Sequence, residues 1–348
     1  MSAWRRAAVA LVAILLAVLA APAPAAAVGP ERPRPVLNVD FPDPAVVTTR
    51  GGLVGFATGG RVPHAWSRTV AGGWRPGGPV LTRHPAWARD GGIWAVDVAR
   101  VGGAWLLYYA VPVRGMGEHG RCVAVARSRS PRGPFRPVGG RPLVCPSYAA
   151  TPLALDPLLP RDRTLPRAGV IDPSHFRDAD GSSYLLYKTD RVPSSIRLLP
   201  LAPSGTRPLP GATSVELFRF DGVLENPVLT RRPEGYVMLL SEGDWTKCSY
   251  RTVWRRAPSL LDWSLAESGV LLDETSRLCG PGGGDLAVAG GRELLFVHGW
   301  TCHRTTRPCE GRAKWDHRPR ARGIRALYAA RLGWVGGLPV VTDWVRRR

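Results

Sequence analysis

One pattern occurs five times along this chain of 348 residues, and it restricts the possible folds more than any other feature of the sequence. A turn that contains glycine is followed by a short run of aromatic and aliphatic residues, too short for a helix and bounded by turn residues. The pattern predicts five central β-strands, at residues 51–59, 102–110, 181–189, 234–243 and 291–299.

Further strands are expected on both sides of each central strand. After it come a strand, a tight turn with glycine, proline or serine, and another strand, at 65–76, 122–138, 195–209, 251–265 and 325–341. Before it comes a short apolar segment with one acidic residue, which is Asp43, Asp97, Asp172, Glu225 or Asp285. The unit thus has four strands, and no long amphipathic helix with caps is apparent.

The repeated four-stranded unit predicts an all-β fold, a five-bladed β-propeller with four antiparallel strands per blade. A pair of β-sandwiches is the alternative, but it does not explain why a carboxylate recurs at one place in every unit. In a propeller the first strand of each blade lines the central channel. Acidic residues that are distant in sequence would therefore converge on the axis.

Converging carboxylates suggest a chemistry. Those that share a pocket repel one another when ionised, so at least one keeps its proton to a higher pH than usual. One protonated and one ionised carboxyl group, on either side of a glycosidic bond, are the minimum for its hydrolysis. Asp43, Asp172 and Glu225 are the catalytic candidates. For Asp97 and Asp285 a turn or hydrogen-bonding cap is the better interpretation, with Asp97 kept as a candidate substrate ligand.

Sugar rings stack on aromatic faces, and the chain contains 13 tryptophans. Trp94, at the start of its inner strand, is the first candidate for substrate binding, followed by Trp245 and Trp300. Packing between blades is the alternative for each of them, because large aromatic side chains dominate protein cores.

Six segments occur in the order FPDPAV, WAVDVARVGGAWLLYY, CVAVARSRSPRGPF, VIDPSHFRDADGSSYLLY, LENPVLTRRPEGYVMLLSEGDW and GPGGGDL. Together they resemble the family-forty-three glycoside hydrolases, the group of arabinanases, α-L-arabinofuranosidases and β-xylosidases. The resemblance implies a five-bladed propeller that cleaves O-glycosidic bonds of arabinose- or xylose-containing saccharides with inversion. By motif, Asp43 would be the general base and Glu225 the general acid, while Asp172 would raise the pKa of Glu225 and orient it.

Two departures from that family pattern concern the site. Asn226 follows Glu225, where relatives often carry a small residue, and Gly283 stands where relatives often carry a histidine that helps to hold a central ion. No metal site is therefore expected, and a structural calcium is doubtful. His298 is expected to be a packed, hydrogen-bonded core residue. The departures keep open an alternative function, a non-catalytic glycan-binding propeller of the cell envelope.

The N-terminus has the features of a secretion signal. A basic start is followed by an apolar run over 7–20 and by small residues, so residues 1–27 are expected to be a signal peptide. Residues 28–348 would then form one secreted catalytic domain, a monomer acting on polysaccharide or oligosaccharide, with no membrane attachment. An uncleaved membrane anchor is the alternative.

The net charge of +20 comes almost entirely from arginine. The arginines are scattered along the chain, without a basic helix or an aromatic-interleaved stripe, so nucleic acid is not expected as a partner. The charge could still favour adhesion to acidic polymers.

The six cysteines of an exported chain favour disulfides over a metal site. Six cysteines allow 15 pairings, and the sequence alone does not choose among them. Proximity favours Cys122–Cys145, Cys248–Cys279 and Cys302–Cys309.

Overall fold

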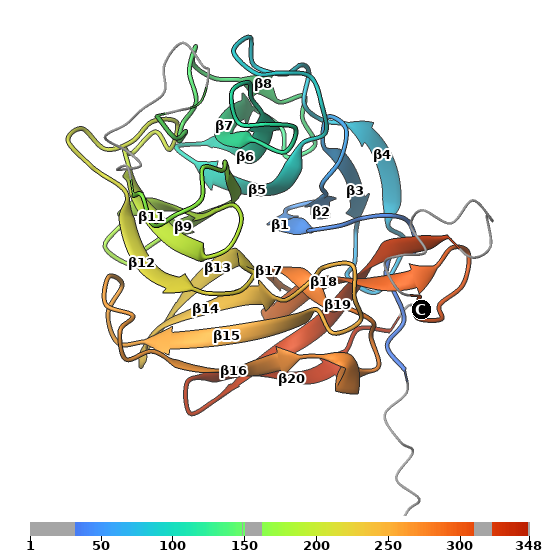
Figure 1. Cartoon of the computed structure of the whole chain (residues 1–348). Helices are drawn as coiled ribbons and strands as arrows, with labels where there is room; N and C mark the ends of the chain where they lie inside the picture. The colour runs from blue at the N-terminus through green and yellow to red at the C-terminus, as the bar shows by residue number, and fades with distance from the viewer. Residues whose placement is uncertain (1–31, 148, 150–161, 310–321, 347–348) are drawn as a thin grey trace, which may run out of the picture. The chain divides into compact units, whose positions relative to one another are not determined.

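Twenty strands make up five four-stranded antiparallel sheets in the computed structural model, which describes residues 32–147, 149, 162–309 and 322–346. The sheets are arranged in a ring, so the unit Pro33–Arg348 is the predicted five-bladed β-propeller (Figure 1). Within the described ranges, the only helix is the 3₁₀ turn Glu274–Ser276, and no helix is long and apolar enough to cross a membrane. The expected signal peptide, 1–27, lies outside the described residues.

Each blade is contiguous in sequence, and its strands follow one another from the inside of the ring to the outside. Blade 1 contains β1 (Ala45–Thr49), β2 (Gly52–Phe56), β3 (Pro63–Ser67) and β4 (Arg75–Pro79). Blade 2 contains β5 (Trp94–Val101), β6 (Ala104–Pro112), β7 (Arg121–Ser128) and β8 (Arg136–Pro137). Blade 3 contains β9 (Val170–Arg177), β10 (Ser183–Thr189), β11 (Ser194–Leu201) and β12 (Val215–Phe220). Blade 4 contains β13 (Leu224–Arg232), β14 (Gly235–Glu242), β15 (Arg251–Ala257) and β16 (Glu267–Leu272). Blade 5 contains β17 (Gly282–Ala289), β18 (Arg292–Cys302), β19 (Gly323–Val335) and β20 (Leu338–Trp344).

The five central strands are confirmed, but the outer strands of blades 3 and 4 were predicted too early. β12 and β16 begin at Val215 and Glu267, beyond the expected hairpins 195–209 and 251–265. In blade 3 the intervening segment is rich in proline, which cannot donate to a strand ladder. In blade 4 the side chain of Asp262 accepts a bond from the Ser264 amide at 3.1 Å and holds the segment in a turn.

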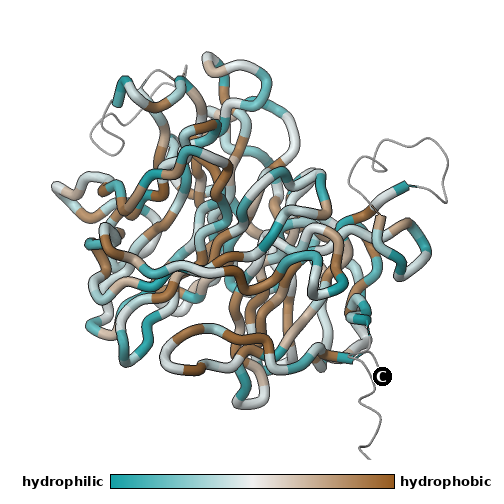
Figure 2. The backbone as a smooth tube through the Cα atoms, turned by 60° about the horizontal axis from the view of Figure 1, so that its bottom comes forward, coloured by the Kyte–Doolittle hydropathy of each residue, from teal (hydrophilic) through white to brown (hydrophobic). Residues whose placement is uncertain are grey.

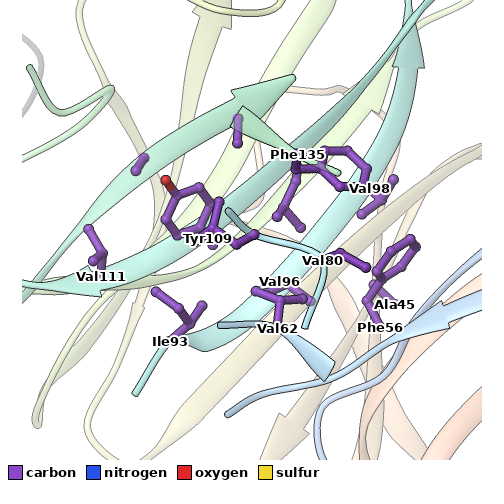
Figure 3. Packing of buried hydrophobic residues seen from close by; sticks show 14 of the residues in the cluster. Ala45, Phe56, Val62, Val80, Ile93, Val96, Val98, Tyr109, Val111 and Phe135 are labelled. Atoms are coloured by element: carbon purple, nitrogen blue, oxygen red, sulfur yellow. The ribbon is translucent and has the colours of Figure 1, made fainter. Parts of the chain in front are cut away.

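A hydrophobic cluster fills each junction between neighbouring blades. Between blades 1 and 2, Phe56 of β2 meets Phe135 edge to face, with a centroid distance of 6.0 Å (Figure 3). Figure 2 shows hydrophobic stretches within the sheets and hydrophilic ones in many connecting loops. Because both faces of each sheet are covered by neighbours, the central strands are nearly continuous apolar runs.

The segment before β1 closes the ring against blade 5. The Leu327 amide of β19 donates to the Leu37 carbonyl at 3.0 Å, and the Phe41 amide donates to the Arg325 carbonyl at 2.7 Å. This attachment ends two residues before Asp43. Asp43 is therefore positioned by blade 5 as much as by blade 1.

Three disulfides connect Cys122–Cys145, Cys248–Cys279 and Cys302–Cys309, and they use all six cysteines. The pairing favoured by proximity is confirmed. The second bridge ties the loop after β14 to the segment that leads into β17, next to the inner strands of blades 4 and 5.

Candidate active site

A left-handed residue occurs at one equivalent position in the inner segment of every blade. These residues, with positive φ, are Asp43 (48°), Ala95 (26°), Asp172 (55°), Asn226 (51°) and Gly283 (59°). In blades 2–5 the residue lies in a β-bulge, where the inner strand carries one residue more than its partner. Such a bulge bends the strand and redirects its side chains, and Asp, Asn and Gly adopt this backbone most readily.

This register corrects the expectation that the five acidic residues occupy one repeated position. Only Asp43 and Asp172 stand at the left-handed position. Glu225 comes one residue before it, and Asp97 and Asp285 come two residues after it. The five carboxylates thus lie at three levels along the channel.

The three predicted catalytic carboxylates lie near one another, and Asp97 and Asp285 of the third level line the same cavity as Asp43 and Asp172. Asp43 and Asp172 line the same cavity of about 30 Å³, with room for a water molecule or two. Asn226 lines it as well, and its amide donates to Asp172 Oδ2 at 3.0 Å, which places the adjacent Glu225 beside the cavity.

Asp172 is the carboxyl group that keeps its proton. Burial raises the pKa of Asp172 to about 8, and the negative charges of Glu225 and Asp43 act in the same direction. The charge of Lys188 and the Asn226 amide oppose this shift only in part. At neutral pH Asp172 therefore still holds its proton.

Glu225 is held at both carboxylate oxygens. Lys188 Nζ lies 3.0 Å from Oε2, and the Tyr250 hydroxyl donates to Oε1 at 2.8 Å. Burial disfavours the charge of Lys188, but the carboxylates of Glu225 and Asp172 raise its pKa above the usual value. Burial, with the charges of Glu225 and Asp43, raises the pKa of Tyr250 far above its ordinary value, so its hydroxyl remains a donor.

Asp43 is held from blade 5. Its amide donates to His298 Nδ1 at 3.2 Å, and its carboxylate lies 3.5 Å from Arg325 Nη1. Burial lowers the pKa of His298 to about 3, so the imidazole is neutral and accepts the amide proton. Arg325 is therefore the cation that balances Asp43, and His298 is the packed, hydrogen-bonded residue expected from sequence.

The tryptophan candidates differ in what they can offer a sugar. Trp300 is only 1 % exposed and donates to the Trp245 carbonyl at 2.8 Å, so its expected role in substrate contact is corrected to that of a support. The half-buried Trp245 stacks on it, and Arg325 lies 4.7 Å from the Trp245 ring. Trp94 is half-buried, and the guanidinium of Arg121 lies 3.1 Å from its ring centroid.

Asp97 and Asp285, at the third level, join neighbouring blades. Asp97 accepts the His175 amide of blade 3, and Asp285 accepts the Val46 amide of blade 1, both at 2.6 Å. This matches the capping role favoured from sequence. Burial raises the pKa of Asp97 to about 6 and, together with the charge of Asp97, raises that of Asp285 to about 8.

These raised pKa values predict that stability falls between about pH 7.5 and pH 8.5. In this window the histidines are largely neutral in both states, while folded Asp172 and Asp285 still hold part of the protons that the unfolded chain has lost. Each contributes a fall of up to about 1.4 kcal/mol per pH unit. Urea unfolding at these two pH values should show the fall in wild type and a clearly smaller one in Asp285→Asn. Equal slopes would contradict the assignment.

The residues near Gly283 do not fit a histidine-ligated calcium. A Cβ at this position would lie 2.6 Å from His298 Nδ1 and 2.7 Å from Asp43 Oδ1, so a side chain here would force these neighbours to move. The Nδ1 atom of His298 already accepts the Asp43 amide. Across the described ranges, no group of three or more His, Cys, Asp or Glu side chains is placed to hold a metal ion.

Sequence reasoning missed Lys188, Tyr250 and Arg325, which contact the predicted carboxylates. Lys188 gave a usable signal, because it is one of three lysines and is the only charged residue in the buried strand β10. Nothing in the sequence distinguishes Tyr250 or Arg325 from the other tyrosines and arginines.

A propeller with carboxylates gathered at one end of its channel defines a class of protein, the glycoside-cleaving propellers. The model for the glycosyl hydrolases family 43 matches residues 32–316, and the chain belongs to this family. It is accordingly a glycoside hydrolase. Comparison of the sequence with curated proteins finds no match.

Solved structures share the fold at low sequence identity. A thermostable family-43 glycoside hydrolase has a TM-score of 0.67 and 17% identity, over 92% of this chain and 97% of that one. The Cellvibrio cellulosa α-L-arabinanase has a TM-score of 0.66 and 20% identity, over 89% and 99%. An endo-1,4-β-xylanase from Bacteroides thetaiotaomicron has a TM-score of 0.61 and 16% identity, over 92% and 99%.

Proposed function

We propose that this protein is a secreted, inverting hydrolase of arabinose- or xylose-containing saccharides, with activity of the α-L-arabinofuranosidase or β-xylosidase type. The observation that carries the proposal is the gathering of Asp43, Asp172 and Glu225 at one end of the channel. The similar arabinanase and xylanase structures support a pentose substrate by analogy only, because they establish the fold alone.

In the proposed mechanism each carboxyl group has its own role. Asp43, ionised beside Arg325, takes a proton from the attacking water. Glu225 donates a proton to the leaving oxygen, and the neighbouring Asp172 has the role of raising the pKa of Glu225 and holding its orientation. The hydroxyl of Tyr250 fixes the orientation of the Glu225 carboxyl group.

The stereochemical course tests this mechanism. With aryl α-L-arabinofuranoside or aryl β-D-xyloside, proton NMR in the first minutes should show the anomer opposite to that of the substrate, before mutarotation mixes the two. Early accumulation of the same anomer would instead require a retaining mechanism, with Asp43 acting as a nucleophile. Activity on neither substrate, with activity on another glycoside in a panel, would refute the sugar assignment.

One observation favours the alternative, a glycan-binding propeller without activity. Lys188 Nζ lies 3.0 Å from Glu225 Oε2, and a cation at this distance favours the form of a carboxyl group that has no proton to donate. Incubation with arabino- or xylo-oligosaccharides distinguishes the two functions. Bound ligand that stays intact for days would favour the binder, whereas released pentose would refute it.

Secretion is part of the proposal and rests on the N-terminal sequence. Cleavage after Ala27 would give an exported protein that begins at Val28. N-terminal sequencing of the protein from culture medium should find this residue first, and an intact Met1 would indicate an uncleaved anchor.

A further inference from the structure

The positive charge of the chain is concentrated in blades 1 and 2. Residues 45–145 contain 14 arginines, no lysine and three acidic residues, a net charge of +11 out of the total +20. The described part of blades 3–5, 162–309 and 322–346, contains 22 basic and 18 acidic residues, a net charge of only +4. The arginines are scattered along the chain, as expected, with 14 among the 101 residues of 45–145 and 20 among the 173 residues of the described part of blades 3–5. The net charge differs because acidic residues are scarce in blades 1 and 2.

The few acidic residues of blades 1 and 2 do not balance these arginines. Asp97 lines the channel cavity, and its carboxylate accepts a hydrogen bond from the backbone amide of His175. Within the described residues of these two blades, the single ion pair is His84–Asp90. The arginines at the outer edge therefore face solvent without acidic partners.

Two of these arginines are held against one tryptophan. Arg75 of β4 stands directly opposite Trp66 of β3, and its guanidinium lies 5.1 Å from the ring centroid. The guanidinium of Arg132 lies 4.9 Å from the same ring. Both arginines are exposed, whereas Trp66 packs partly on the core between blades 1 and 2. We call Trp66, Arg75 and Arg132 the Trp66 patch.

Arg132 reaches this ring because its turn is anchored in the neighbouring blade. The Phe135 amide donates to the Val80 carbonyl at 2.8 Å, and the Phe135 ring is fully buried in the core between the two blades (Figure 3). The turn is thereby fixed to blade 1. Both guanidiniums of the patch are preorganised by cation–π contact, which lowers the entropy cost of binding an anion.

The adjoining edge of blade 2 has a feature that costs stability. Arg127 and Arg136 are directly opposite in the β7–β8 ladder, and both are exposed. Like charges in this position repel. No carboxylate in the described residues lies within ion-pair distance of either one, so an external polyanion would relieve the repulsion.

We propose that the Trp66 patch, with Arg127 and Arg136 beside it, is an exosite for a polyuronate, an anionic polysaccharide whose carboxylates pair with the guanidiniums. Arginine suits this partner because its planar fork binds a carboxylate with two parallel hydrogen bonds. Single-stranded nucleic acid fits less well, since its bases need an aromatic face for stacking and the Trp66 ring is flanked by two guanidiniums. The exosite would hold the enzyme on an acidic polymer while the channel acts on its glycosidic bonds.

The test uses the full chain and soluble polygalacturonate as the probe. Affinity electrophoresis and titration calorimetry at low salt should show binding for wild type. Binding should weaken about tenfold in Arg75→Gln/Arg132→Gln, since two exposed ion pairs are worth up to about 1 kcal/mol each. The matched control is Arg207→Gln/Arg292→Gln, which removes the same charge from exposed positions in blades 3 and 5 and should bind nearly as well as wild type.

Three outcomes would overturn the exosite. These are no binding of polygalacturonate, an equal loss in both double variants, or tighter binding of duplex DNA or of anionic vesicles than of polygalacturonate at the same salt concentration. Because binding is measured without turnover, failure here leaves the hydrolase assignment intact. An inactive channel would likewise leave the exosite testable.

Discussion

Asp43→Asn and Glu225→Gln are each expected to lower kcat on aryl pentosides by about 10²–10⁴-fold, the usual contribution of a general base or acid. The asparagine cannot take a proton from water, although it keeps the shape that packs beside Arg325 and His298. The glutamine keeps the bond from the Tyr250 hydroxyl but has no acidic proton to give. Steady-state kinetics with purified variants measures both effects.

The control for these variants is Glu267→Gln, which removes a carboxylate from the exposed outer strand of blade 4 and should leave kcat unchanged. Melting temperatures of Asp43→Asn and Glu225→Gln should stay close to the wild-type value, because both replacements conserve volume. Wild-type turnover in both variants would end the assignment of roles. A large fall in melting temperature would show that the lost activity comes from unfolding.

The fold was predictable because the residues that define each blade are close together in the sequence. A glycine turn followed by a buried strand occurs in each blade, and five copies of one four-stranded unit leave few architectures other than a ring. The outer strands of blades 3 and 4 escaped prediction because polar turns and prolines lengthen their connections. These connections depend on hydrogen bonds to side chains, such as the one that the Ser264 amide donates to Asp262. The periodicity of hydrophobic residues does not predict such bonds.

The candidate catalytic carboxylates were located from short motifs, but their environment could not be predicted in this way. The cation beside Glu225 comes from 37 residues earlier, and the cation beside Asp43 comes from 282 residues later. Such pairs form only when the ring of blades closes, and no local sequence pattern predicts which distant residues then meet. The exact level of each carboxylate also depends on a one-residue bulge, which shifts side chains without changing the apparent repeat.

Gly283 shows how a departure from the family pattern can be required by the structure. Gly283→Ala is expected to lower kcat by about a hundredfold, since displacement of a catalytic group by about 1 Å has an effect of this size. The new Cβ would lie 2.7 Å from Asp43 Oδ1 and 2.6 Å from His298 Nδ1, so Asp43 has to move. Kinetics with aryl pentosides and urea unfolding measure the loss of activity and of stability.

Gly290→Ala is the matched control, because Gly290 has the same φ of 59° and an added Cβ there meets no atom within 4 Å. Both variants carry the cost of a left-handed alanine, about 1 kcal/mol, but only Gly283→Ala also pushes on Asp43. The kcat of Gly290→Ala should therefore stay at the wild-type level. If both variants lost activity alike, backbone strain would explain the effect. If neither variant lost activity, the space beside Asp43 could hold a side chain. The argument against a histidine-ligated calcium would then fail.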